Sequence, residues 1–211
     1  TDCVMLSGET ADGPYFEQAV RVMARTCCEA EGCRDYKHLF ISIRESVRSR
    51  YGALMPPPES LASSAVKTAI DVRASLIVVI SETGNTARMI AKYRPPSTIV
   101  CLTMSDAVAR QCSGTLAGVH AYTVKSLVDT VGLVQETGRE AVDAGICQPG
   151  DLMVVVSGTL RGPGHNDQIR VQVIPGRNHV TTSAGMTLPK LQSFVVAILQ
   201  DQAEIAAALV Q

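Results

Sequence analysis

Short apolar runs alternate with amphipathic stretches along the middle of the chain. Three runs rich in branched apolar residues, at 76–80, 99–103 and 119–124, have the length of buried strands. Between them, the segments 85–93 and 106–112 carry apolar residues at helical spacing. Strands of this composition that alternate with helices are typical of a parallel sheet covered on both faces.

The same alternation continues toward the carboxyl end. A helix is expected over 127–144, and strands over 151–157 and 169–174. No helix fits into 158–168, so the last strand is expected to return antiparallel beside its predecessor. With one more helix over 59–72, the pattern predicts an α/β fold with a mostly parallel five-stranded sheet and helices on both faces.

The region ahead of this domain has a different pattern. Apolar residues at helical spacing predict helices over 16–31 and 36–50. The apolar run from Cys3 to Leu6 fits a buried parallel strand that ends in polar residues. Three prolines, Pro56 to Pro58, favour a stiff and extended segment, so a domain junction is expected there.

The last stretch of the chain predicts an amphipathic helix over 189–210, because its apolar residues recur in steps of four and three. Two interpretations fit this helix: it packs back on its own sheet, or it docks on another protein. We favour docking, because the preceding segment 176–189 has the composition of a tether.

Composition narrows the function classes. Hydrophobic residues are 46% and charged residues 18% of the chain, below the usual ~25% of charged residues, which indicates a globular domain with part of its surface covered by partners. Because 19 basic residues stand against 20 acidic ones, no overall field favours nucleic acid or an anionic membrane. The apolar runs are far shorter than the ~20 residues of a membrane-spanning helix.

The seven cysteines are scattered without a CxxC pair or a matching histidine spacing. This pattern indicates neither a disulfide framework nor a zinc site, and it fits a reducing cytoplasm. Cys27, Cys28, Cys33 and His38 lie close in sequence, but Cys27 falls on the apolar face of the helix predicted there. Core packing is therefore the expected role of this group.

One loop carries candidate binding chemistry. It lies between the strand 76–80 and the helix 85–93, so its amide and hydroxyl groups are placed to cradle a phosphate at a helix amino terminus. An ordinary strand-to-helix turn, with Ser81 or Thr83 as N-cap, is the alternative that we favour. Glu82 counts against phosphate, because a carboxylate repels it. The candidate phosphate-binding residues are Ser81, Thr83, Gly84, Asn85 and Thr86.

Several segments resemble pyruvate kinase, and together they cover residues 1 to about 175. The opening DCVMLSGET (2–10) is similar to a barrel strand and turn of that family, and ESLASSAV (59–66) to the first helix of its C-terminal domain, especially in plant cytosolic enzymes. The stretch 76–95, which ends in AKYRP, resembles its central strand, phosphate loop and helix.

The resemblance divides the chain into three parts. It implies that 1–55 is a remnant of a catalytic (β/α)8 barrel and that 59–175 is the family's C-terminal α/β domain. The tail 176–211, a linker and amphipathic helix, matches nothing in the family. A chain that opens at the last strand of a barrel is expected to be a fragment.

The implied activity is phosphoryl transfer from phosphoenolpyruvate to ADP, with magnesium and potassium, in a homo-oligomer. The family's metal-binding carboxylates, its catalytic lysine and its lid domain belong to segments with no match here. We therefore expect this chain alone to bind neither metal and to be inactive, serving subunit contact and regulation. The alternative is a non-catalytic scaffold or binding module derived from the same domain.

The resemblance also implies roles for particular residues. Ser7 and Glu9 match the rim of the active site, although Ser7 and Thr10 as helix caps explain the same residues. The loop 81–86 matches the family's allosteric phosphate loop. For a sugar-phosphate effector, a second loop, 158–166, would contribute Arg161, Gly164 and His165. A helix arginine completes the pocket in the family, and the stretch aligned with it here, 131–134, offers only apolar side chains.

Overall fold

The computed structural model describes residues 2–52, 54–158 and 166–176. Five strands form one sheet in the order β3-β2-β1-β4-β5. All neighbours are parallel except β4 and β5, which are antiparallel. The mostly parallel five-stranded sheet and its antiparallel last strand are therefore confirmed. The strands are β1 (Leu76–Ile80), β2 (Thr98–Thr103), β3 (Val119–Thr123), β4 (Leu152–Gly158) and β5 (Asn166–Val173).

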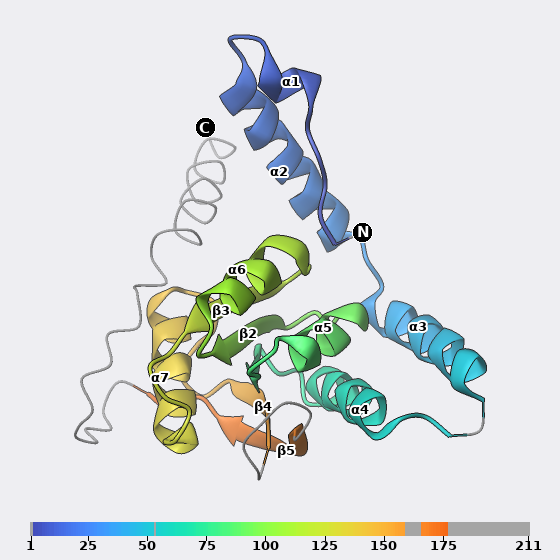
Figure 1. The fold of residues 1–211 in the computed structure, drawn as a ribbon, viewed down its shortest axis with the longest axis vertical. Coiled ribbons are helices and arrows are strands. Elements are labelled where there is room, and N and C mark those ends of the chain that lie inside the picture. Colours follow the sequence, from blue (N-terminus) through green and yellow to red (C-terminus); the bar gives the residue numbers. More distant parts are fainter. Residues whose placement is uncertain (1, 53, 159–165, 177–211) are drawn as a thin grey trace.

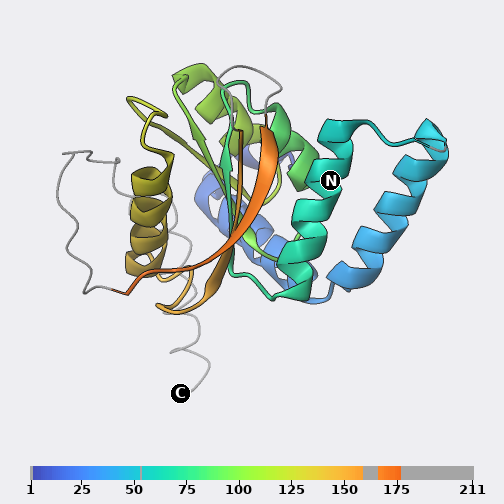
Figure 2. The same ribbon diagram turned by 90° about the horizontal axis from the view of Figure 1, so that it is seen from below.

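Helices cover both faces of this sheet (Figures 1 and 2). One apolar core joins a face of the sheet to α3, α4, α5 and α6, and a second core joins the opposite face to α7. The helices are α1 (Gly8–Ala11), α2 (Phe16–Gly32), α3 (Tyr36–Tyr51), α4 (Pro57–Asp71), α5 (Asn85–Lys92), α6 (Asp106–Thr115) and α7 (Thr130–Asp143).

The burial of the central strand β1 explains why residues 76–80 form an uninterrupted apolar run. Ile77 and Val79 point into the first core, whereas Leu76, Val78 and Ile80 point into the second. Every residue of β1 is buried. A strand covered on both faces needs apolar residues at every position, which is what a parallel sheet between helical layers requires.

The three prolines do not form the extended junction that their sequence predicts. Pro56 alone is extended, with φ −55° and ψ 143°, and α4 already begins at Pro57. A proline is tolerated in the first turn of a helix because the amide group that it lacks would have no helical partner there. The helix expected from residue 59 therefore starts two residues earlier.

The strand predicted from Cys3 to Leu6 is absent from the structure. These residues have no regular secondary structure, and Val4 and Met5 are 54% and 83% exposed. Among the described residues no neighbouring strand lies alongside them, so their amide and carbonyl groups have no ladder to join. The peptide is not inserted into the later sheet either.

The helix α2 projects from the body of the molecule together with α1 (Figure 1). None of its residues is buried, and Phe16, Val20 and Val22 are each more than half exposed. The expected core packing of Cys27 is therefore wrong for this structure, in which Cys27 and Cys28 are half-buried. The helix itself forms as its apolar spacing predicts.

The predicted helix over 189–210 and its tether lie outside the described residues. No helix in the described part of the chain is long and apolar enough to span a membrane.

Candidate functional site

The connections of the sheet change direction at the central strand β1. From β1 the chain moves outward to β2 and β3, and then returns to the other side of β1 to form β4. Ligands of open α/β sheets bind outside the carboxyl ends of the strands, at the point where the strand order changes direction. The loop 81–86, which the sequence singles out, leaves β1 at this point.

Two hydroxyl groups hold the loop in shape. The Ser81 hydroxyl accepts a hydrogen bond from the Gly84 amide at 3.1 Å, and the Thr83 hydroxyl accepts one from the Asn85 amide at 3.4 Å. The N-cap of α5 is Gly84, with no side-chain capping bond, so the prediction that Ser81 or Thr83 is the N-cap is wrong. The two hydroxyls stabilise the turn just ahead of the cap instead.

Gly84 is required at its position for two reasons. Its φ of +74° lies in the left-handed region that favours glycine. A Cβ atom there would also lie 2.5 Å from the Cys112 sulfur and 3.1 Å from Val108 Cγ1. Both residues belong to α6, so the loop rests directly on that helix.

The Cys101 and Cys112 thiols near the loop are expected to be unreactive. Burial, with the nearby Cys112 as a smaller cause, raises the pKa of Cys101 to about 12, and burial also raises the pKa of Cys112. A buried thiol that stays protonated is a poor nucleophile. These two cysteines therefore pack the site and do not act chemically in it.

Asn166 joins the loop to the start of β5. Its side-chain amide donates to the Ile80 carbonyl at 3.0 Å and to the Thr86 hydroxyl at 2.7 Å. Because the Thr86 oxygen accepts this bond, its own hydrogen remains available to donate. Sequence reasoning missed Asn166, since only the antiparallel return of β5 brings it to the end of β1.

Some donors at the start of α5 stay open. No partner for the Thr86 and Ala87 amide groups lies among the described residues. With the Thr86 hydroxyl, these groups form an anion receptor of the kind found at helix amino termini. The arrangement is suited to binding an oxyanion.

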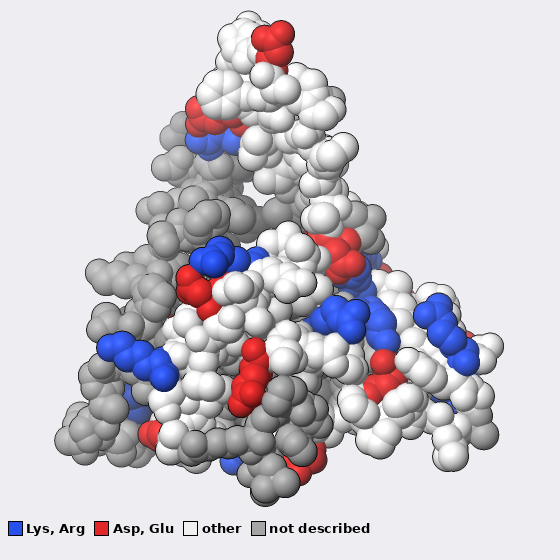
Figure 3. All heavy atoms as spheres, viewed as in Figure 1, with Lys and Arg blue, Asp and Glu red and all other residues white. Residues whose placement is uncertain are grey.

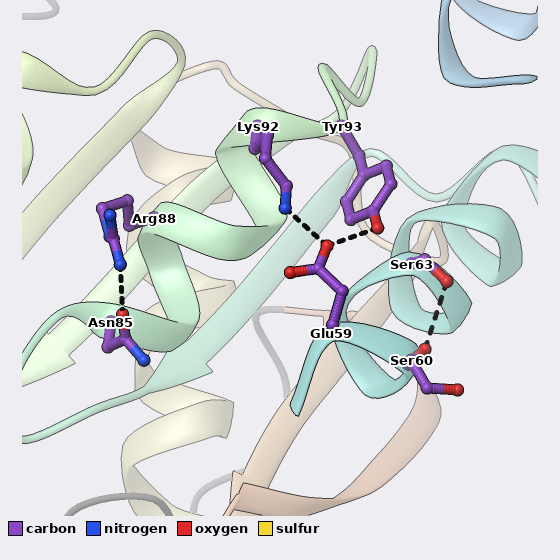
Figure 4. Close-up of polar contacts among 7 residues, drawn as sticks. All are labelled: Glu59, Ser60, Ser63, Asn85, Arg88, Lys92 and Tyr93. Carbon is purple, nitrogen blue, oxygen red and sulfur yellow. Dashed lines mark hydrogen bonds and ion pairs between the residues drawn. The ribbon is translucent and has the colours of Figure 1, made fainter. Parts of the chain in front are cut away.

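Charges of both signs border this receptor. Glu82 is half-buried in the loop, and its carbonyl accepts a hydrogen bond from the Thr103 hydroxyl at 3.2 Å. One turn along α5, the Arg88 guanidinium donates to the Asn85 side chain at 2.8 Å (Figure 4). Arg88 is thus a cation beside the loop. Sequence reasoning missed it, although its spacing of three residues from Asn85 indicates that the two side chains share a helix face.

The structure does not bring the remaining described site residues to the loop 81–86. Ser7 stands at the N-cap of α1 without a side-chain capping bond, and Thr10 instead donates from its hydroxyl to the Ser7 carbonyl at 3.3 Å. Capping by these two side chains is therefore wrong. The helix α1, which follows Ser7, lies at the end of α2 that points away from the sheet (Figure 1). The side chain of Glu9, and all of Arg161, Gly164 and His165, lie outside the described residues.

A metal centre was not expected in this chain. Within the ranges that the structure describes, no group of three or more histidine, cysteine, aspartate or glutamate side chains is placed to hold a metal ion.

Comparisons with known proteins agree on one family. Residues 59–172 match the family model described as pyruvate kinase, alpha/beta domain. A pyruvate kinase of Dictyostelium discoideum is 39% identical over 178 residues, which are 82% of this chain and 34% of the relative. A cytosolic isozyme of pyruvate kinase from Glycine max is 38% identical over 74% of this chain and 33% of its own length.

A solved structure gives the same result. The crystal structure of a pyruvate kinase from Cryptosporidium parvum superposes with a TM-score of 0.74 at 39% identity, covering 82% of this chain and 33% of that one. The chain thus spans about a third of the length of the relatives that it matches.

Proposed function

This chain belongs to the pyruvate kinase family, and we propose that it is the carboxyl-terminal part of an enzyme that transfers a phosphoryl group from phosphoenolpyruvate to ADP. The match to full-length relatives supports this most strongly, because it extends over 82% of the chain and so beyond the α/β domain. Plant relatives named cytosolic isozymes support a place in the cytoplasm and in glycolysis.

We propose that the chain alone is inactive. Phosphoryl transfer depends on positioning and on cations that neutralise the developing charge. The family uses magnesium and potassium, but the described residues do not fit a magnesium site, since they assemble no cluster of acidic or histidine ligands. The carboxylates that hold the metal would therefore come from the two thirds of the enzyme that this chain does not span.

The exposed face of α2 supports the division of the chain at residues 1–55. A groove of about 720 Å³ runs beside α2 and is lined largely by apolar side chains, including Leu6, Tyr15, Val22 and Met23. Apolar surface of this extent normally packs against a partner. In the complete enzyme, the remaining strands and helices of the barrel would cover it. Subunit contacts of the α/β domain and a partner for the predicted helix 189–210 are part of the same proposal.

The loop 81–86 is proposed to hold a phosphate group of a sugar-phosphate effector. The open amides of Thr86 and Ala87 and the cation of Arg88 support this role. Ser81, Thr83, Gly84 and Asn85 would shape the loop, and Arg161 and Gly164 would close the pocket from the second loop. Glu82 opposes binding, so we expect weak affinity that rises when this charge is removed.

Calorimetric titration with a sugar bisphosphate tests the effector site. Saturable binding that strengthens in E82Q and weakens in T86V is expected. If the wild-type chain and E82Q both show no saturable heat at millimolar ligand, the loop is only a strand-to-helix turn.

An assay coupled to lactate dehydrogenase tests the catalytic part of the proposal. We expect no pyruvate formation by the chain alone in the presence of magnesium and potassium. Turnover by the isolated chain would contradict it. The rival function, a non-catalytic scaffold, is favoured by the exposed apolar face of α2, which would then bind another protein. It predicts that the chain stays inactive even when joined to a functional catalytic portion.

A further inference from the structure

A second cavity lies where α3 meets the carboxyl end of α5, at the opposite end of that helix from the loop 81–86. Its volume is about 320 Å³, which lies at the small end of the ~300–1,000 Å³ range of ligand pockets. Most of its wall comes from one face of α3, and Lys92 of α5 closes the other side. The α3 residues are Ser42, Ile43, Ser46, Val47, Arg50 and Tyr51.

The charged side chains of this wall, Arg50 and Lys92, are both basic. Some exposed basic side chains of the described residues are paired, as in Arg21 with Glu17 and Arg110 with Asp106. Arg50 makes no ion pair or hydrogen bond with the described part of the chain, and the same holds for Arg44 on the same helix. Figure 3 shows basic side chains gathered over α5 and α3.

One buried carboxylate lies beside the cavity, and it does not balance these charges. An oxygen of Glu59 accepts hydrogen bonds from Lys92 and from the Tyr93 hydroxyl, both at 2.5 Å (Figure 4). The Lys92 ammonium also lies 5.1 Å from the centre of the Tyr93 ring. Lys92 is thus fixed in place while 41% of its side chain stays exposed. The cavity wall thus carries two cations, Arg50 and Lys92, and only Lys92 is paired with Glu59.

The rest of the wall is apolar or hydroxylic. Ile43 and Val47 form the inner wall, with Val47 part of the main core, and Tyr51 offers a half-exposed ring. The Ser42 and Ser46 hydroxyls stand one helical turn apart and have no partner among the described residues. A pocket with hydroxyls, an unpaired guanidinium and an aromatic edge complements an anion attached to an apolar body.

We propose that this cavity binds a small organic oxyanion, a phosphate or carboxylate on an apolar body. Arg50 and Lys92 hold the charged oxygens, the two serine hydroxyls donate to them, and Tyr51 with Ile43 contacts the apolar part. The site is distinct from the loop 81–86 and does not depend on phosphoryl-transfer activity.

The test is a residue-resolved NMR titration of the whole chain with phenyl phosphate, benzoate and the neutral benzyl alcohol. The amide signals of residues 42–51 and of Lys92 are expected to shift saturably with at least one of the two anions, and not with the alcohol. A stronger response to phenyl phosphate or to benzoate identifies the preferred oxyanion. Shifts confined to 81–88 would place binding at the phosphate loop and overturn the proposal.

Two arginines on the same helix provide a matched comparison. R50Q removes the cation that lines the cavity, and R48Q removes the same charge from an exposed position that does not. R50Q is expected to weaken binding about tenfold, equivalent to about 1.4 kcal/mol, and R48Q less than about twofold. S46L fills the cavity from its wall and is expected to abolish binding. R50Q is expected to leave the fold intact.

Equal weakening by R48Q and R50Q would mean diffuse attraction to a basic helix and would overturn the proposal. So would the absence of saturable shifts at ten millimolar probe, or unchanged binding in S46L.

Discussion

At the scale of single residues, Gly84 determines how closely the phosphate loop approaches α6. We predict that G84A destabilises the fold by about 2–4 kcal/mol, because left-handed strain of about 1 kcal/mol adds to an overpacking cost of about 1–3 kcal/mol against the Cys112 sulfur. Urea denaturation measures this loss. G145A is the matched control, since Gly145 has nearly the same φ of +73° but open space around it. Equal losses in both variants would show that contact with Cys112 has no cost.

Loss of the Glu59 side chain is expected to lower the free energy of unfolding. Its carboxylate is 7% exposed and receives both Lys92 and the Tyr93 hydroxyl. We predict that E59A costs about 2–3 kcal/mol of unfolding free energy, because it leaves the buried Tyr93 hydroxyl without an acceptor, whereas the partly exposed Lys92 ammonium can be solvated. Y93F removes only one neutral donor and should cost about 1–1.5 kcal/mol.

Thermal and urea denaturation of both variants and of the double variant check this prediction. Additive effects of E59A and Y93F would contradict a direct coupling between the two side chains, since contacting residues in one network are not additive.

Some site residues were predictable because their chemistry is local. The hydroxyls of Ser81 and Thr83 bind amides two or three residues away, so the sequence pattern alone indicates a structured turn. Asn166 and Cys112 were not predictable in this way, because β-sheet pairing and helix packing bring them to the loop from distant segments. Such contacts follow from the topology and leave no local signal.

At the scale of elements, the central strands β2, β1 and β4 were predictable within a few residues, because burial on both faces demands unbroken apolar runs. The errors occur where context overrides propensity. Pro57 and Pro58 enter the first turn of α4, where a missing amide costs nothing. Residues 3–6 have the composition of a strand but no neighbouring strand with which to pair. A strand forms only where two segments pair, so the pattern of one segment alone cannot predict it.

The helix α7 carries a titratable group that opposes folding near neutral pH. Burial, followed by the nearby charges of Glu136 and Asp143, raises the pKa of Glu140 from 4.5 to about 7. The folded state therefore binds more protons than the unfolded state between these values. Stability is expected to fall as pH rises from about 4.5 to about 7.

We predict that E140Q removes this dependence and is more stable than the wild type at pH 8 by about 1 kcal/mol, after allowance for the solvent that reaches the carboxyl group. Urea denaturation at several pH values between 5 and 8 is the measurement. Parallel pH profiles for E140Q and the wild type would rule out this residue as the cause.

At the scale of the whole molecule, one ion pair fastens the amino-terminal peptide to the α/β domain. Asp2 accepts from the Arg94 guanidinium at 2.9 Å and from the Ala117 amide at 3.4 Å. The hydrogen bond from Arg94 lowers the pKa of Asp2. Since the folded pKa lies below the unfolded value, this contact stabilises the fold above that value and is lost as pH falls through the folded pKa.

We predict that D2A, which removes the acceptor of both hydrogen bonds, releases the first residues without unfolding the sheet, because a partly exposed pair contributes only ~0–1 kcal/mol. Hydrogen exchange at the Ala117 amide and limited proteolysis of residues 2–15 are the measurements. Unchanged protease resistance of residues 2–15 in D2A would mean that other contacts hold the peptide in place.

The central claim is that this chain supplies the carboxyl-terminal third of a pyruvate kinase and lacks the rest of the catalytic apparatus. Its most direct test joins residues 1–211 to the portion of the Dictyostelium discoideum pyruvate kinase that precedes the matched region, and measures pyruvate formation from phosphoenolpyruvate and ADP. The account predicts activity in the joined protein and none in either part alone. A folded joined protein without activity, or turnover by residues 1–211 alone, would contradict it.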